Sequence, residues 1–225
     1  MTVHILLIES NNLAQTESLL PSLEQQGHQV CLAHSPSTAV TNINANWPNL
    51  VIFNNHFLQP NLSSFHEAIS QTNLNIPYLV VSGQNHLTPP DDVEFSVARS
   101  GKPEHLTQAI QKVITKQQNR FIRLVDLTVD CDQHQVLRNG TSYNLTPKEF
   151  KLLQLLLKNA DQVSSRKSIM QEVWETDYLG DTRTLDVHIR WLREKIEENP
   201  SRPRHLITVR GVGYHFIAKP EEPAV

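Results

Sequence analysis

The chain has 225 residues, a formal net charge of −3 and 39% hydrophobic residues. This length and hydrophobic content suit two domains with modest cores, and the charge argues against a protein coated uniformly with basic residues for nucleic acid. No apolar run approaches the roughly 20 residues of a membrane-spanning helix, so we expect a protein without a membrane partner.

The first half alternates buried strands with a helix. Apolar strands are predicted over 3–8, 50–53 and 78–81, and a helix over 13–26 that ends at Gly27. Strands that are apolar throughout are typical of parallel sheets covered by helices on both faces. We therefore predict an α/β doubly wound domain over residues 1–118.

The first nine residues contain a short apolar run without a basic lead or a cleavage-type ending. We interpret this run as a buried first strand rather than a signal peptide, and expect a cytoplasmic protein.

Polar residues follow the predicted strands of this half. Glu9 and Ser10 follow the first strand, Asn54 the second and Ser82 the third, and Lys102 lies in a later Gly-Lys-Pro segment. The carboxyl ends of parallel strands meet at one edge of a doubly wound sheet, where such sheets bind ligands. These five residues are the candidate pocket of the first half.

Motifs for metal or nucleotide chemistry are missing from the sequence. Cys31 and Cys131 are distant, no histidine pair has zinc-ligand spacing, and neither a G-x-G-x-x-G nor a phosphate-binding loop occurs. We predict no cofactor, no metal and no enzymatic activity. A nucleotide-binding protein or enzyme built on the doubly wound half is the rival interpretation.

After a linker predicted at 119–123, a second domain is expected over 124–219, followed by a tail at 220–225. Short strands are predicted over 127–129, 135–138 and 141–145, with a turn at Asn139-Gly140. Thr146, Pro147 and Glu149 have the spacing of a capping box at a helix start. That helix is expected to bury Phe150, Leu153, Leu156 and Leu157.

The segment 182–216 predicts an amphipathic helix followed by a hairpin. One helix face carries Leu185, Ile189, Leu192 and Ile196, and the opposite face Arg183, Thr184, Val187, Arg190 and Trp191. Gly211 and Gly213 allow a tight turn that presents Arg210 at its tip. Seven basic residues stand against four acidic ones between Arg183 and Arg210. A solvated surface helix would share the pattern, but helix and hairpin together favour DNA binding.

Four ordered motifs carry a family resemblance: LTPKEFKLL from Leu145, the Ser165-Arg166 to Val173-Trp174 helix, RTLDVHIRWLR from Arg183 and TVRGVGY from Thr208. This half resembles the winged-helix output domain of OmpR/PhoB-type response regulators, and the first half resembles their receiver domain. The resemblance implies a flavodoxin-like receiver followed by an α+β winged helix-turn-helix domain. It also implies a sequence-specific transcription regulator whose partner is double-stranded promoter DNA.

The resemblance also supplies DNA-binding candidates. Arg183, His188 and Arg193 match phosphate-side positions, and Arg190 is expected to contact a base or a phosphate. Trp191 stands where a relative can carry a base-contacting arginine, so it is expected against a thymine methyl or the sugar-phosphate edge, or packed on the preceding loop. Trp174 is expected at a phosphate or in the core. The full set is Trp174, Arg183, Thr184, Val187, His188, Arg190, Trp191, Arg193, Thr208 and Arg210.

The first half departs from the receiver pattern. A phosphorylatable receiver would carry two acids at Glu9-Ser10 and an aspartate at Asn54, whereas one of these three carboxylates is present. An amide is a poor nucleophile, and Mg²⁺ needs carboxylate oxygens, so we expect regulation without aspartyl phosphorylation. Pro89-Pro90 predicts a short or displaced fourth receiver helix, and Arg99 indicates an altered dimer face.

Several alternatives stay open at this stage. The receiver cleft is either a polar cluster that satisfies its own hydrogen bonds or a site for a small ligand or a regulatory protein. A homodimer is a further partner that the family pattern allows. A protein-interaction adaptor, whose winged helix has become a docking surface, is the alternative to a DNA-binding regulator.

Overall fold

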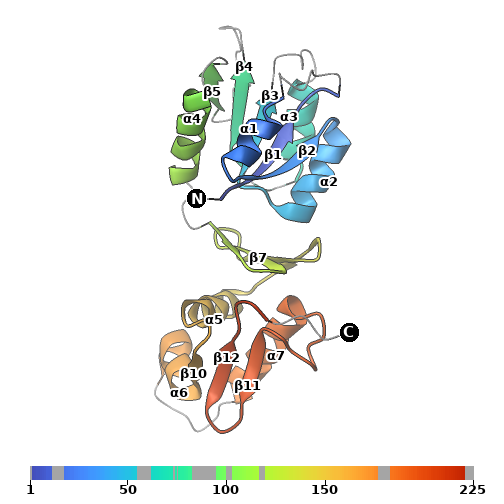
Figure 1. Ribbon diagram of the computed structural model, residues 1–225. Helices are drawn as coiled ribbons and strands as arrows, with labels where there is room; N and C mark the ends of the chain where they lie inside the picture. Colours follow the sequence, from blue (N-terminus) through green and yellow to red (C-terminus); the bar gives the residue numbers. More distant parts are fainter. Residues whose placement is uncertain are drawn as a thin grey trace. The chain divides into compact units, whose positions relative to one another are not determined.

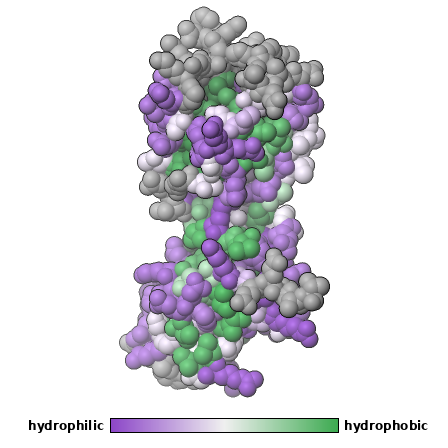
Figure 2. All heavy atoms as spheres, viewed as in Figure 1, coloured by the Kyte–Doolittle hydropathy of each residue, from purple (hydrophilic) through white to green (hydrophobic). Residues whose placement is uncertain are grey.

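The computed structural model describes residues 2–11, 18–54, 62–72, 74, 76–82, 95–99, 103–116, 120–176 and 183–220. The chain divides into two compact units, Met1–Asn119 and Arg120–Val225 (Figure 1). Of the helices among these residues, none has both the length and the apolar character that a membrane span requires. Figure 2 shows hydrophilic side chains spread over the visible face of both units, with hydrophobic patches between them.

The first unit is a parallel sheet with helices between its strands. Its elements are β1 (His4–Ile8), α1 (Leu20–Gln25), β2 (Gln29–Ala33), α2 (Pro36–Asn46), β3 (Leu50–Asn54), α3 (Leu62–Ser70), β4 (Tyr78–Ser82), β5 (Phe95–Arg99) and α4 (Pro103–Lys116). The strand order is β2-β1-β3-β4-β5, and all four pairings are parallel. This is the flavodoxin-like order, so the predicted doubly wound fold is confirmed.

Two apolar clusters fill the two faces of this sheet. Alternate strand residues point to opposite faces, so Leu6 and Phe53 join one cluster with α2 and α3, whereas Leu7 and Ile52 join the other with α1 and α4. Every residue of β3 is buried. The strand that ends in Asn54 is therefore fixed on both faces.

Parts of the first unit differ from the prediction. The described part of the helix expected at 13–26 begins only at Leu20, because Ser18 and Leu19 bond to the Glu9 carboxylate and Pro21 stands in the first helical turn. β2 and α2 were not predicted, since β2 is a half-exposed edge strand without a continuous apolar run. The helix expected around Pro89-Pro90 lies outside the described residues.

In its described residues, the second unit combines two antiparallel sheets with three helical segments. Its elements are β6 (Phe121–Arg123), β7 (Leu127–Asp130), β8 (Gln135–Arg138), β9 (Thr141–Asn144), α5 (Pro147–Lys158), β10 (Val163–Ser165), α6 (Arg166–Ile169), its π-helical continuation η1 (Met170–Trp174), α7 (Arg183–Ile196), β11 (Leu206–Val209) and β12 (Gly213–Phe216). The sheets have the orders β6-β7-β8-β9 and β10-β12-β11. This arrangement is the predicted α+β winged helix.

The linker prediction was wrong for residues 121–123. They form β6, which pairs antiparallel with β7. Arg120, just before this strand, makes a buried ion pair of 2.8 Å with Asp130. A guanidinium can enter the interior in this way when a carboxylate accepts its hydrogen bonds.

The capping box at the start of α5 is confirmed. Thr146 accepts a hydrogen bond from the Glu149 amide, and the Glu149 carboxylate accepts one from the Thr146 amide. The predicted buried face was partly wrong, because Phe150 and Leu157 are only half-buried, whereas Leu152 and Leu155 are buried with Leu153 and Leu156. Since α5 packs against α7, η1 and β12, its apolar stripe is wider than a single three-four pattern indicates.

Gly213 has a different role from the predicted one. The turn between β11 and β12 uses Gly211, whose φ is +74°, whereas Gly213 is the first residue of β12 and pairs with Ser165 of β10. A Cβ atom at Gly213 would lie 2.0 Å from the carbonyl oxygen of Ser164. This glycine therefore lets β12 approach β10 closely.

Replacing Gly213 with alanine is expected to destabilise the second unit by at least about 2 kcal/mol, because the added methyl meets backbone atoms. Thermal unfolding followed by circular dichroism should then show a Tm lower by about 8 °C or more. Gly211→Ala is the matched control, since open space surrounds its Cβ and only the positive φ opposes it. Equal Tm values for the two variants would contradict the close-approach role.

Candidate functional site

Helix α7 separates an apolar face from a polar one. Leu185, Ile189, Leu192 and Ile196 are buried in the core of the second unit. The exposed residues of α7 include Arg183, Thr184, Val187, Arg190 and Trp191 together with the acids Asp186 and Glu194, and His188 is half-buried beside them. Arg190 is 80% exposed and pairs with Glu194 at 3.2 Å. Six of the ten side chains predicted for DNA contact therefore share the solvent side of one helix.

Three aromatic rings form a contiguous row along this side. His188 makes edge contacts with Trp174 at 5.0 Å and with Trp191 at 5.1 Å, measured between ring centroids. The Nδ1 atom of His188 donates a hydrogen bond of 2.8 Å to the carbonyl oxygen of Thr184. Trp174 is half-buried, and Lys148 lies over its ring. The loop on which Trp191 was alternatively expected to pack lies outside the described residues.

The hairpin of β11 and β12 forms the wing. Its turn is closed by a 3.1 Å hydrogen bond from the Val212 amide to the Val209 carbonyl oxygen. Arg210 is exposed at the start of this turn, as expected for a tip residue. Thr208 precedes it on β11 with an exposed side chain. The wing therefore presents one cation at its end.

Arg193 connects α7 to the wing. Its Nε and Nη2 atoms donate to the carbonyl oxygen of Leu206 at 2.9 and 2.6 Å, and Nη2 also donates to the Thr208 hydroxyl at 2.8 Å. Burial lowers the pKa of the Arg193 guanidinium. Arg193 was expected at a phosphate from the family resemblance, but two of its nitrogens are directed to the wing.

A network that the sequence analysis missed joins the start of α7 to β12. The Arg166 Nη2 atom lies 2.7 Å from an Asp186 carboxylate oxygen, and the Tyr214 hydroxyl donates to the same oxygen at 2.5 Å. Arg166 also donates to the Tyr214 hydroxyl at 3.1 Å. Burial, with the neighbouring carboxylate of Asp186, raises the pKa of Tyr214. Asp186 was the signal of this network in the sequence, because a carboxylate on a helix rich in basic residues needs a cationic partner.

Glu197 fixes the path of the chain from α7 to β11. Its buried carboxylate accepts hydrogen bonds from the amides of Arg204, His205 and Leu206 at 2.8, 3.0 and 2.7 Å. Three amide donors satisfy a carboxylate that burial would otherwise destabilise. The helix and the wing are thereby held in one rigid arrangement.

Two of the residues predicted for the cleft of the first unit bond to each other. Because β1 and β3 are neighbours with Ile8 opposite Phe53, the residues that follow each strand meet. Glu9 and Asn54 are both buried, and the Asn54 amide donates to Glu9 Oε1 at 2.8 Å. The same carboxylate accepts from the Leu19 amide at 2.7 Å and the Ser18 hydroxyl at 2.6 Å.

The other predicted members of this cleft are described less fully. Ser10 is half-buried next to Glu9. Ser82 ends β4, and only its backbone is described. Lys102 lies outside the described residues. The structure therefore brings together Glu9 and Asn54, with Ser18 and Leu19 as partners that the sequence analysis did not include.

Comparisons with known proteins place the chain in a family. Residues 140–216 match the family described as "Transcriptional regulatory protein, C terminal". A probable transcriptional regulatory protein of Picosynechococcus is 40% identical over 61% of this chain and 54% of its own length. The regulatory protein SphR of Synechococcus elongatus, named for alkaline phosphatase synthesis, is 36% identical over 61% of this chain and 52% of its own.

A further relative aligns over almost the whole chain. The transcriptional regulatory protein AfsQ1 of Streptomyces coelicolor is 31% identical over 94% of this chain and 97% of its own length. This chain belongs to the OmpR/PhoB-type response regulators. The matches to the first two relatives, by contrast, span about half of those proteins.

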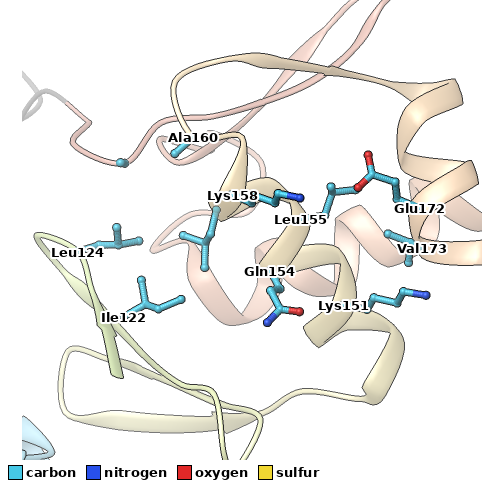
Figure 3. Close-up of a pocket in the computed structure, with 11 residues that line it drawn as sticks. Ile122, Leu124, Lys151, Gln154, Leu155, Lys158, Ala160, Glu172 and Val173 are labelled. Carbon is cyan, nitrogen blue, oxygen red and sulfur yellow. The ribbon is translucent and has the colours of Figure 1, made fainter. Parts of the chain in front are cut away.

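The second unit of this response regulator also contains an apolar cavity of about 630 Å³. Figure 3 shows Ile122 and Leu124 on one side and α5 side chains, Leu155 among them, on the other. Lys158 and Glu172 also line it. None of the predicted DNA-contacting residues belongs to this cavity.

The Glu149 carboxylate should make the stability of this response regulator depend on pH. Burial raises the pKa of Glu149, but hydrogen bonds from Lys195 at 2.6 Å and from Thr146 outweigh it, so the pKa lies below its ordinary value of 4.5. The ionised form thus stabilises the fold above about pH 4.5, and this contribution is lost as the pH falls through the lowered pKa.

Glu149→Gln is expected to lower the free energy of unfolding at pH 7 by about 1–2 kcal/mol, since the amide keeps the cap but loses the ion pair. Urea unfolding at pH 7, 5 and 3.5 should show a smaller loss of stability on acidification than in the wild type. The control is Glu198→Gln, which changes an exposed glutamate. Parallel pH profiles for wild type and Glu149→Gln would refute this role.

Proposed function

We propose that the chain is a regulator that binds double-stranded promoter DNA in a sequence-specific manner, and that it is not an enzyme. The observation that supports this best is the fixed arrangement of the α7 solvent side and the Arg210 wing tip. Arg193 links the two directly, and the Asp186–Tyr214 contact links them a second time. Two contact elements held at one spacing suit a duplex, whose grooves and phosphates repeat regularly.

Each element has a chemistry that fits one part of DNA. A single α-helix fits the major groove, where Arg190 can bond to guanine or to a phosphate. A narrow minor groove attracts an arginine such as Arg210, and Arg183 can contact the backbone. Two acids of the unit, Asp186 and Glu197, are bound to partners within the protein. A third, Glu194, pairs with Arg190 at 3.2 Å on the surface, where an exposed ion pair is weak enough for a phosphate or a base edge to replace the carboxylate. This supports DNA over a protein-docking surface.

Removing two of these cations should weaken DNA binding and reduce its salt dependence. The double variant Arg190→Ala, Arg210→Ala is expected to lower the slope of log K against log salt by about 0.9 for each lost phosphate contact. Fluorescence anisotropy with promoter fragments at several salt concentrations measures the slope. Lys112→Ala, which removes an exposed charge from α4, is the control. Unchanged affinity and slope in the double variant would exclude the DNA interface.

We also propose that the receiver works without aspartyl phosphorylation. Three donors surround the Glu9 carboxylate, and one of them is the amide that stands at the phosphoacceptor position. A bound Mg²⁺ would need the Glu9 carboxylate as a ligand, so it would have to displace these hydrogen bonds. One of them comes from the Asn54 N–H group, which occupies the carboxylate oxygen that the cation would need. The residues present do not fit the metal, and the Asn54 amide lacks the carboxylate oxygen that attacks phosphorus.

The same hydrogen bonds bear on the alternatives for the cleft. A carboxylate that accepts three bonds supports a self-satisfied cluster over a site for a small ligand. We keep a regulatory protein at the receiver and a homodimer as predictions that rest on the family pattern alone. A protein-interaction adaptor remains the alternative function, and failure of the DNA-binding test would favour it.

Incubating the full chain with acetyl phosphate and Mg²⁺ is expected to add no phosphoryl group, as read by intact-protein mass spectrometry. The double variant Ser10→Asp, Asn54→Asp restores three carboxylates and shows whether acids are all that the cleft lacks. A stoichiometric phosphoryl gain by the wild type, abolished by Asn54→Ala, would contradict phosphorylation independence.

A further inference from the structure

The apolar cavity of the second unit has a cation in its lining. Its volume is about 630 Å³, and Ile122, Leu124, Leu155 and Val173 form much of its apolar wall. Ile122 and Leu124 are only half-buried, so this wall contacts solvent. Lys158 lines the same cavity, is exposed and has no ion-pair partner among the described residues. Apolar surface in contact with water is unfavourable, so a cavity of this kind marks a docking region.

The chain itself leads to this cavity after β12. The Ile217 amide donates to the carbonyl oxygen of His205 at 2.7 Å, and the Ala218 amide donates to Asp161 Oδ1 at 3.2 Å. Ala218 also lines the cavity, and Pro220 is half-buried. The path of the chain is therefore fixed as far as the cavity wall. The next five residues, 221–225, lie outside the described residues.

The sequence of residues 221–225 complements the cavity. It reads Glu-Glu-Pro-Ala-Val, which is two acids followed by three apolar residues. The acids need a cation and the apolar residues need an apolar wall, and the cavity offers both. Figure 3 shows Lys158 between Ala160 on one side and Glu172 on the other, so the cation is central in the lining.

The other charged groups of the cavity lining already have partners. Lys151 pairs with Glu175 at 2.7 Å, and Glu172 accepts a hydrogen bond from the Ser168 hydroxyl at 3.1 Å. An acid that enters the cavity therefore meets Lys158 as the available cation.

We propose that residues 221–225 dock in this cavity, with their acids at Lys158 and their apolar residues against Leu124 and Leu155. Five residues span at most about 17 Å, which is enough to cross a cavity of this volume. Because the segment is tethered, its effective concentration at the cavity is on the order of millimolar, so modest contacts hold it where a free ligand of the same chemistry would not bind. Pro220 and Pro223 restrict φ and lower the conformational entropy that docking removes.

Chemical cross-linking tests whether the acids lie beside Lys158. A carbodiimide joins a lysine amine to a carboxylate as an amide, and the water that is lost converts the reagent to a urea, so only groups in contact react. With the full chain at a concentration too low for contacts between copies, peptide mass mapping is expected to find Lys158 joined to Glu221 or Glu222. Lys167, an exposed lysine of α6 outside the cavity lining, is the reference for accidental contacts.

A variant with an unchanged tether separates docking from mere proximity. Pro223→Gly, Ala224→Ser and Val225→Ser together keep both acids and the length of the segment and remove its apolar side chains. Loss of one buried valine side chain alone is expected to lower the ratio of docked to free segment by about tenfold, so the yield at Lys158 should fall toward that at Lys167. An unchanged yield would show that the tether alone explains the contact, and would overturn the proposal.

A second measurement reports on the cavity itself. Anilinonaphthalene sulfonate binds exposed apolar surface, and its fluorescence then rises. The chain without residues 221–225 and the triple variant should both give a stronger signal than the full chain, because both uncover Leu124 and Leu155. Equal signals in all three proteins would mean that the segment does not cover the cavity, which contradicts the proposal. Circular dichroism spectra and Tm values establish that each variant is folded.

Other occupants of the cavity give different results. When chains with heavy and normal isotopes are mixed, a cross-link between a heavy and a normal peptide would mean that the segment docks on a second copy, and our inference would be wrong. A strong dye signal in the full chain, unaffected by truncation, would leave the cavity to a separate partner and also overturn it. Cross-links within one chain at Lys158 that need the apolar residues, with a dye signal that rises on truncation, support the inference. The proposed DNA binding is independent of these outcomes, because none of its residues lines the cavity.

Discussion

The burial of one face of α7 is the constraint on which the second unit depends. Four aliphatic side chains fix the rotation of this helix against α5, and only then do Arg183, Val187, Arg190 and Trp191 share a solvent side. Rotating the helix by a single residue, about 100°, would bury a guanidinium and expose a leucine. The hydrophobic core therefore selects which side chains can meet a ligand, although no core residue would touch it.

Besides Asp130 with its Arg120 partner, three buried carboxylates of the described residues complement this apolar packing. Glu9 joins β1, β3 and the start of α1, Glu149 joins α5 to α7, and Glu197 joins α7 to β11. Each would be costly alone in the interior, and each accepts several hydrogen bonds, at least one of them from outside its own helix or strand. Apolar contacts are tolerant of small shifts, whereas such hydrogen bonds are directional. The carboxylates thus specify the positions that packing leaves loosely defined.

Local patterns predicted much of the fold. Periodicity identified both faces of α7, the capping box located the start of α5, and Asn139-Gly140 placed a turn correctly. The failures concern long-range contacts. The pairing of β6 with β7, the close approach of Gly213 to β10, and the bonds from Arg193 to the wing depend on neighbours that sequence spacing does not reveal. In the cleft, the sequence identified Glu9 and Asn54, but their partners Ser18 and Leu19 became visible only in three dimensions.

The bond between Asn54 and Glu9 has a consequence for timing. An acyl phosphate is a short-lived mark whose hydrolysis returns a regulator to its resting state, so a receiver that carries one has an internal clock. Under the proposed phosphorylation independence, a receiver with this amide–carboxylate pair has no such clock. Promoter occupancy would then follow the number of copies in the cell, and the response would decay only as fast as the chain is diluted by growth or removed by proteolysis.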